Sequence, residues 1–374
     1  MGRDSYFGEQ VLWSGRPKRV TVPPLYRWCA IVSGVIALTS TMSAIAVGAV
    51  LEVPVGTMLL FAAWMATVAL AFWRLPLWWR SELEYTITDA NIIVRRGRIR
   101  RFIDRRSISF ARIHWDPAHS DVGDLELVRA VPTGALRRRL TIVLTGISAP
   151  DRVWAFVRGI TPSTPAGDGH RLLAQRLDDG ERVLWSAHPV SHWRSWLPSS
   201  GRAALSLVLG LSLVGVAVGT ARNAIHSLRT VIEAGLSPGS VAFIALAAAL
   251  TLSVALLGSA AVAILYVNVI RPAWLDRETR YLVTDRRVLI QRGQEELHLD
   301  RERIVDVIDA PANGGKTHLF LVLDGPRARA FAPSGAFGEE NGGGLQPVLK
   351  LIEDAEAVTK ILKSPPRDEL RAAA

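Results

Sequence analysis

Four long runs of apolar residues divide the chain. Residues 28–50 and 55–73 form the first pair and residues 203–221 and 241–270 the second, and none of these runs contains an acidic or basic side chain. Because about 20 apolar residues span the hydrocarbon core of a bilayer as a helix, the runs predict four transmembrane helices arranged as two hairpins. The alternative, helical hairpins buried inside a soluble protein, fits these lengths less well.

The segments beside these runs refine that prediction. Residues 51–54 allow only a tight turn in the first hairpin, whereas residues 222–240 predict a longer connection, which we interpret as a small extramembrane segment. Trp73, Trp78 and Trp79 follow the second run, as expected of aromatic side chains at a membrane interface.

Lysine and arginine in the flanks predict the orientation. They precede and follow each hairpin, and the first hairpin tip has none, although the second tip carries Arg222 and Arg229. Since basic residues are enriched on the cytoplasmic side, we expect both termini and both polar regions in the cytoplasm. The predicted location is the bacterial cytoplasmic (plasma) membrane. The flanking basic residues are Arg16, Lys18, Arg19, Arg27, Arg74, Arg80, Arg194, Arg202, Arg271, Arg277 and Arg280.

The polar region after each hairpin begins with the same pattern. Tyr85-Thr-Ile-Thr-Asp89 leads to Arg96-Gly97, and 196 residues later Tyr281-Leu-Val-Thr-Asp285 leads to Arg292-Gly293. β-favouring runs separated by an Asx-type turn and a glycine turn predict three short antiparallel strands. In the first copy we expect strands at 85–88, 92–95 and 98–103, and in the second at 281–284, 288–291 and 295–299.

A second repeated motif precedes each hairpin. Glu9-Gln-Val-Leu-Trp13-Ser-Gly-Arg-Pro17 matches Glu181-Arg-Val-Leu-Trp185-Ser-Ala-His-Pro189, at a spacing of 172 residues. We expect each tryptophan to lie in an early strand packed on its own copy. Two ordered motifs around two hairpins indicate a tandem duplication, with 24 additional residues in the second copy.

The remaining polar segments predict further strands and one helix in each copy. The strands are expected at 105–113, 125–130 and 137–144 in the first copy, and at 304–308, 320–323, 328–331 and 348–352 in the second. Helices are expected at 152–159 and 355–363, each with an acidic residue near its start. Residues 161–169, rich in Pro, Gly, Ser and Thr, are interpreted as the linker between copies, and the glycine-rich residues 334–344 as an exposed loop.

These motifs, in this order around a helical hairpin, resemble the bacterial membrane-anchored pleckstrin-homology-like family of the YdbS and YdbT type, formerly a domain of unknown function. The resemblance covers nearly the whole chain. It implies that each copy forms a cytoplasmic β-barrel of about seven strands with a C-terminal helix, and it supplies no catalytic residues. The expected domains are: cytoplasmic segment 1–27; hairpin 28–79; pleckstrin-homology-like (PH-like) domain 80–160; linker 161–179; pre-membrane segment 180–202; hairpin 203–271; PH-like domain 272–364; and tail 365–374.

Motifs for catalysis, metals and cofactors are weak. His114, Asp116, His119, Asp121 and Asp124 share one short stretch, but their spacing matches no standard zinc or calcium site. Asn313-Gly-Gly-Lys316-Thr317 lacks the first glycine of a phosphate-binding loop, and a strand rather than a helix is expected after it. No nucleophile-elbow or paired-carboxylate pattern occurs, so we expect no enzyme, no metal and no cofactor.

Arginine gives the one positive signal for a site. The net charge is +10, from 44 basic and 34 acidic residues, and a basic stretch between residues 95 and 106 holds one acid, Asp104. The matching stretch of the second copy, residues 291–302, has only Arg292 and Arg301 among four acids. Either the arginines are merely a topology signal, or they bind anionic lipid headgroups or an acidic partner. The candidate residues are Arg95, Arg96, Arg98, Arg100, Arg101, Arg105 and Arg106, with Arg137, Arg138 and Arg139 as an extension.

Nucleic acid is a poor match for this stretch, because only Phe102 offers a ring for base stacking. We therefore expect a non-enzymatic multi-pass membrane protein whose cytoplasmic domains contact anionic lipid, another membrane protein or a second copy of the chain. The alternative is a component of a small transporter, pore or export system. Charge-free helices argue against an ion or proton path.

Overall fold

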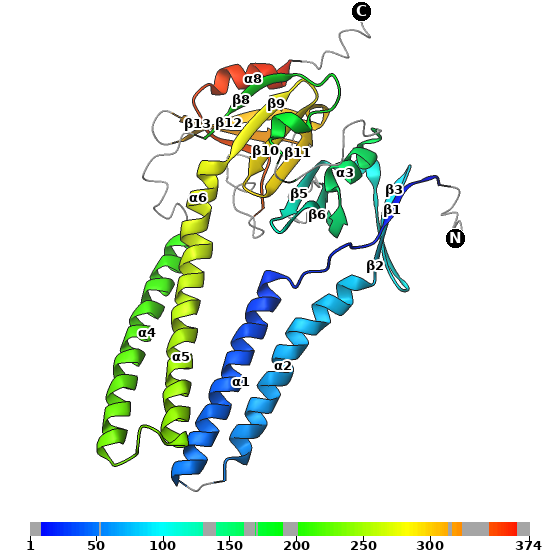
Figure 1. Ribbon diagram of the computed structural model, residues 1–374. Coiled ribbons are helices and arrows are strands. Elements are labelled where there is room, and N and C mark those ends of the chain that lie inside the picture. The colour runs from blue at the N-terminus through cyan, green and yellow to red at the C-terminus, as the bar shows by residue number, and fades with distance from the viewer. Residues whose placement is uncertain are drawn as a thin grey trace, which may run out of the picture. The chain divides into compact units, whose positions relative to one another are not determined.

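The computed structural model describes residues 9–51, 54–129, 140–160, 169, 171–189, 201–312, 316–323 and 344–364. The chain divides into two compact units (Figure 1). One comprises residues 21–79 and 193–274, and its described part is mostly helical. The other comprises residues 1–20, 80–192 and 275–374, and its described part consists mostly of antiparallel sheets.

The helical unit confirms the prediction of four apolar helices long enough to cross a membrane. The fourth continues without a break through a π-helical turn, η4, into α6. The third helix is longer than expected: most of the connection predicted at 222–240 is helical, because α4 extends to Glu233. The bounds are α1 Pro24–Leu51, α2 Gly56–Ser81, α4 Gly201–Glu233, α5 Val241–Leu265, η4 Tyr266–Ile270 and α6 Arg271–Glu278.

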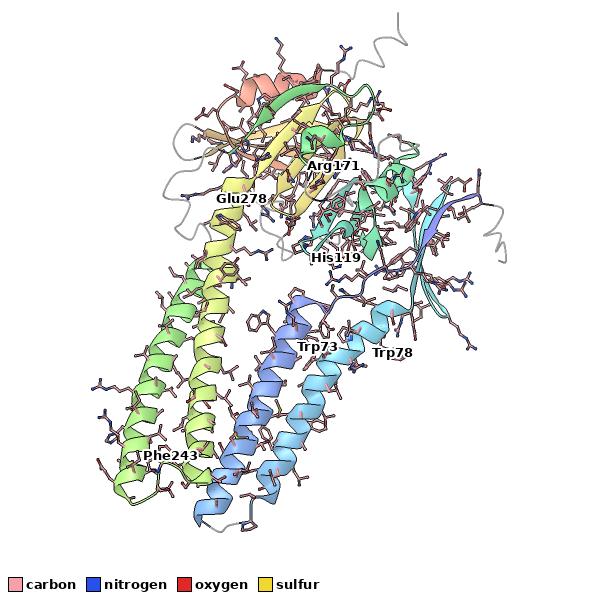
Figure 2. All side chains as sticks on the ribbon, in the orientation of Figure 1. Trp73, Trp78, His119, Arg171, Phe243 and Glu278 are labelled. Carbon is pink, nitrogen blue, oxygen red and sulfur yellow. The ribbon has the colours of Figure 1, made fainter. Side chains whose placement is uncertain are left out.

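Small side chains mediate the helix contacts. α5 packs along both α4 and α1, and Gly210 of α4 faces Leu265 at the end of α5 with no room for a Cβ atom. α1 and α2 make an edge-to-face ring contact between Tyr26 and Phe72, whose centroids are 6.1 Å apart. Trp73 and Trp78 lie exposed on the C-terminal half of α2 (Figure 2). Close helix packing through small residues is the usual arrangement in lipid.

The first sheet of the β unit has the order β1-β2-β3-β4. Strand β1, before the first helical pair, lies beside β2, which follows that pair, with Trp13 opposite Ile87. Trp13 is half-buried against the core, as the sequence predicted. The bounds are β1 Val11–Gly15, β2 Leu83–Thr88, β3 Asn91–Arg96 and β4 Ile99–Asp104.

The second sheet contains strands from both halves of the chain. Its order is β7-β6-β5-β11-β10-β9-β8, and β5 of the first half pairs antiparallel with β11 of the second. The bounds are β5 Phe110–Asp116, β6 His119–Arg129, β7 Leu140–Ser148, β8 Val183–Ala187, β9 Arg280–Thr284, β10 Arg287–Arg292 and β11 Glu295–Asp300.

A third sheet, β12-β13-β14, and two short amphipathic helices complete the described part of the unit. The bounds are β12 Asp306–Ala312, β13 Lys316–Val322, β14 Val348–Ile352, α3 Pro150–Arg158 and α8 Ala355–Lys363. The strand predicted at 328–331 lies outside the described residues. The start of the strand predicted at 105–113 is instead a 3-10 turn, η1 Arg105–Ser107, followed by β5.

None of the sheets closes into a barrel, so the expected pair of seven-stranded barrels is not observed. In the described residues, two large hydrophobic cores form instead, each between two sheets, and a smaller cluster forms around Leu282 and Leu289. The first contains Trp115 and Tyr85, with Ile113 and Ala111 from β5. The second contains Tyr281 and Leu297, but also Phe110 from β5 of the first half. Phe110 and its neighbour Ala111 thus enter different cores, because successive side chains of a strand point to opposite faces.

Candidate functional site: an arginine-rich edge strand

The arginine-rich stretch forms the hairpin β3–β4 and the turn after it. Gly97 closes the hairpin with a φ of +54°, a conformation that glycine adopts without strain. In the antiparallel register, Arg95 lies opposite Arg100 and Arg96 opposite Ile99. β4 is the outer strand of its sheet.

The structure separates the seven arginines into two groups. Arg98, Arg100, Arg101 and Arg106 are exposed. The other three are half-buried and have structural contacts. The Nε of Arg95 donates to the carbonyl of Gly97, 3.2 Å away, Arg96 pairs with Glu82 at 3.5 Å, and Arg105 reaches the carbonyl of Phe156 at 3.5 Å.

Arg105 therefore has a structural role at the end of α3, where its cation faces the negative end of the helix. Arg301 does the same in the second half, donating to the carbonyl of Ser364 at 2.8 Å. The extension through Arg137, Arg138 and Arg139 lies outside the described residues. The candidate surface that the structure describes is thus Arg98, Arg100, Arg101 and Arg106.

Two large apolar side chains lie among these arginines. Ile99 is 62% exposed and Phe102 is 75% exposed. From the sequence alone, Phe102 was considered only as the single ring available for base stacking, and its exposure was not predicted. The available signal was the position of Phe102 between Arg101 and Ile103: because Ile103 faces the core, its neighbour must face away from that core. The surface of β4 is therefore both basic and apolar.

A second charge cluster, missed in the sequence, is buried beside the junction of β5 and β11. The carboxylate of Glu181 has no solvent-exposed side-chain surface. It accepts a hydrogen bond from the hydroxyl of Thr284 at 2.7 Å and binds the guanidinium of Arg287 at 2.8 and 2.9 Å. Burial disfavours the charged form of Arg287, but Glu181, Asp178 and Asp300 outweigh this effect and raise its pKa.

The same cluster continues on the face of β11 that lies toward the first core. Arg176 forms an ion pair with Glu296, and its guanidinium lies 4.9 Å from the ring centroid of Trp115. Arg158 pairs with Asp178 and with Asp300, both at 2.9 Å. Buried charges need such partners, since an isolated one costs several kcal/mol. The cluster thus fastens the two halves together.

Burial shifts the pKa of two groups at or near this cluster, His298 and Asp151. Burial lowers the pKa of His298, and the nearby Arg287 and Arg176 act in the same direction, while the bond to Glu296 opposes it. Burial raises the pKa of Asp151. The imidazole ring of His298 and the carboxyl group of Asp151 therefore both favour their neutral forms.

The repeated motifs have a shared structural explanation. Thr88 donates to Glu9 at 2.6 Å and accepts from the backbone of Asn91, as Thr284 does with Glu181 and Arg287. Each glutamate precedes a helical pair and each threonine follows it. The motifs are therefore the two sides of one polar contact that joins the first two strands.

The tyrosines of the motif have matching roles. The hydroxyl of Tyr85 accepts from the backbone of Thr145 at 2.9 Å, and that of Tyr281 accepts from the backbone of Lys350 at 3.0 Å. Each tyrosine thus ties the second strand of its half to the strand before the terminal helix. Burial raises the pKa of Tyr85.

The acidic and histidine side chains between 114 and 124 contact basic side chains, a glutamate or the backbone. Lys18 binds Asp121 at 2.6 Å and lowers its pKa. Arg19 contacts both Asp116 and His119, and Asp124 accepts from the backbone of Gly146. Within the described part of the chain, no group of three such side chains is arranged to hold a metal ion.

Comparison with protein-family models, with curated proteins and with solved structures finds no match to this chain.

Proposed function

We propose that the chain is a non-enzymatic, multi-pass membrane protein of the PH-like type, built by duplication, whose β unit binds anionic lipid headgroups through the exposed arginines of β4. The four apolar helices support the membrane assignment. The constant spacing of elements supports the duplication: β3, β4, η1 and β5 are followed 196 residues later by β10, β11, η5 (Arg301–Arg303) and β12.

Strand pairing supports a single side for the whole β unit. β1 and β2 share a sheet although the first two helices separate them, and so do β8 and β9 around the second pair. Strand partners lie about 5 Å apart, so each helical pair must begin and end on the same side of the membrane. Flanking basic residues make that side the cytoplasm. Reporter fusions after residues 82 and 52 are expected to report cytoplasm and exterior; a periplasmic signal at 82 contradicts the topology.

The observation that carries the lipid proposal is the grouping of four exposed arginines with two exposed apolar side chains. Each basic side chain near an anionic leaflet contributes on the order of 1 kcal/mol. Ile99 and Phe102 add apolar surface suited to the headgroup boundary. The corresponding strand of the second half, β11, is covered by β5 and offers no such surface.

Hydrogen exchange of the full-length protein tests this proposal. The full-length protein is used because the seven-stranded sheet is shared by the two halves, which makes separate halves unsuitable. One molecule is placed in each nanodisc. The backbone amides of residues 98–106 are expected to exchange more slowly in discs containing phosphatidylserine than in discs of phosphatidylcholine alone. Raised salt should remove the difference, since exposed charges are screened over about 8–10 Å. Amides of β11 serve as the internal reference.

The matched variants separate these arginines from charge in general. Changing Arg98, Arg101 and Arg106 together to serine should abolish the effect of lipid charge. Changing three other exposed arginines, Arg129, Arg152 and Arg182, removes the same charge and should leave it intact. Equal exchange of residues 98–106 in the two lipids contradicts the proposal, and so does an equal loss in both triple variants.

The transporter alternative has less support. The four apolar runs contain no ionisable group of the kind that ion and proton pathways use.

A further inference from the structure

β4 and β12 are two of the six edge strands that the three described sheets have. β4 is the last strand of the first sheet and β12 is the first strand of the third sheet. In the described part of the chain, no strand pairs with the outer side of either one. Unpaired backbone groups on a sheet edge are a template for another strand. Ile99 and Phe102 increase that tendency at β4, because they leave large apolar side chains in water.

The chain already contains one example of how such edges join. β11 is the strand of the second half that corresponds to β4, and β5 is the strand of the first half that corresponds to β12. These two pair antiparallel: Glu295, Glu296, Leu297 and His298 lie opposite His114, Ile113, Arg112 and Ala111, respectively. The contact is heterologous, because it joins different edges of the two halves.

The register of this junction can be transferred to the open edges, because all four strands obey the same 196-residue spacing. Arg100 then lies opposite Asp309, and Phe102 opposite Val307. Ile99 lies opposite Ala310, and Arg101 opposite Ile308. One ion pair and two apolar pairs result, and directly opposite residues of these kinds stabilise antiparallel strands.

The charges of the two strands are opposite in sign. β4 contributes Arg100 and Arg101, whereas β12 contains Asp306 and Asp309 and no basic residue. Asp306 pairs with Lys363 at 3.8 Å, and Asp309 accepts a hydrogen bond from Thr359 at 3.4 Å, so Asp309 is the carboxylate that the transferred register brings to Arg100. The ladder ends at Ala310, since the next residue, Pro311, has no N–H to donate. In the internal junction the residue that corresponds to Pro311 is Trp115, and its backbone N–H donates to the carbonyl of Gln294 at 3.0 Å. A shorter ladder makes the external contact weaker than the internal one.

We propose that β4 of one molecule pairs antiparallel with β12 of a second copy of this chain. Within one chain β4 and β12 belong to different sheets and do not pair with each other. Each can therefore pair with a strand of a neighbouring molecule. Every such contact leaves one open β4 and one open β12 at the ends of the pair. Heterologous contacts of this kind continue into rows or rings. The proposal does not depend on lipid binding, because it rests on backbone edges and on Arg100, which the lipid test leaves unchanged.

Disulfide trapping of the full-length protein tests the register. Cys29 is the only cysteine of the chain, and C29S provides a cysteine-free background. A mixture of I99C and A310C proteins in detergent micelles and in shared proteoliposomes is expected to form a mixed disulfide dimer under mild oxidation. I99C mixed with K350C is the control, since Lys350 is exposed on β14 at the other edge of the third sheet.

Charge exchange then tests complementarity. R100E or D309R alone, each in the appropriate cysteine protein, should lower the yield of the I99C–A310C dimer roughly tenfold, because like charges face each other across the strands. Combining R100E with D309R should restore the yield, which also shows that the single variants are folded. The effect of lipid charge on hydrogen exchange of residues 98–106 should not be restored together with the dimer yield.

Three results would overturn the proposal: equal trapping of I99C with K350C, absence of a mixed dimer at all protein concentrations, or a double charge exchange that fails to restore trapping. None of these bears on lipid docking, which is tested separately by the effect of lipid charge on exchange of residues 98–106 and by the two triple variants.

Discussion

Strands β4 and β11 occupy equivalent places in the two halves and have opposite surroundings. Each follows a glycine turn and ends at an aspartate before a 3-10 turn. Four of the six residues of β11 are buried, yet only Ile103 is buried in β4. The difference arises because β5 lies beside β11, whereas no described strand lies on the outer side of β4. The neighbouring strand, rather than the position in the repeated motif, determines whether the side chains of a strand are buried.

The residue types follow that difference. Glu296 and His298 of β11 enter the buried charge cluster, and the corresponding residues of β4 are Arg100 and Phe102. A basic strand in the first half therefore has an acidic counterpart in the second. The polar contact between the first two strands differs in the same way: Glu181 binds a buried arginine, Arg287, whereas Glu9 binds the amide of Asn91.

The largest expected effect tests that second contrast. Replacing Glu181 by alanine leaves Arg287 buried without its main partner, and loss of one member of a buried ion pair costs about 3–5 kcal/mol. Replacing Glu9 by alanine removes hydrogen bonds to neutral groups only, and the expected cost is about 1 kcal/mol. Thermal or denaturant unfolding of the two full-length variants in detergent measures the difference.

A double variant provides the control. Glu181→Ala combined with Arg287→Leu removes both charges and should recover part of the lost stability, because no unpaired guanidinium remains. Equal destabilisation by Glu9→Ala and Glu181→Ala would show that the buried ion pair of Glu181 contributes no more stability than the hydrogen bonds of Glu9.

A smaller effect is expected from pH. Burial holds the pKa of His298 below its ordinary value of 6.5, so below about pH 6.5 the unfolded chain binds a proton that the folded protein excludes. Stability should therefore fall as pH decreases from about 6.5 toward the folded pKa. Asp151 acts in the opposite sense, because its raised pKa favours folding at acid pH, and this contribution is lost as pH rises above 3.8.

The variant His298→Gln isolates the contribution of this ring, and unfolding temperatures at about pH 7 and pH 5.5 measure it. The variant should lose less stability on acidification than the parent. Part of the acid sensitivity should remain, because burial also lowers the pKa of His318. An unchanged pH dependence would show that His298 is not kept neutral in the fold.

Local patterns predicted most of the described elements of this fold, although α4 is longer than expected and η1 replaces the start of one strand. Uninterrupted apolar runs located the four long helices, and the Tyr-x-x-Thr-Asp motif located the three-strand meanders β2–β4 and β9–β11. The early strands containing Trp13 and Trp185 were also predicted, and both tryptophans pack on the core of their own half. These features depend on residues within a short segment, so periodicity and turn residues determine them.

Pairing between distant edges was beyond the reach of those patterns. The alternation of β5 identifies a strand with one buried face, formed by Ala111, Ile113 and Trp115, but nothing in Phe110 to Asp116 specifies β11 as its neighbour. The resemblance implied closed barrels, but β5 pairs with β11 of the other half and the described sheets stay open. The exposed arginines were predicted as a group, yet the structural contacts of Arg95, Arg96 and Arg105 depend on partners such as Glu82 and Phe156, which only the fold brings close.

The pairing of β1 with β2 has a consequence for biosynthesis. The ribosome completes Gly15 long before Leu83, and both helices α1 and α2 are made in the interval. At about 5–20 residues per second, β1 waits roughly 3–14 seconds for its partner. During that time its backbone edge is available to chaperones or proteases. Synthesis of both helices thus precedes completion of the first sheet, and any delay in that interval delays the pairing of β1 with β2.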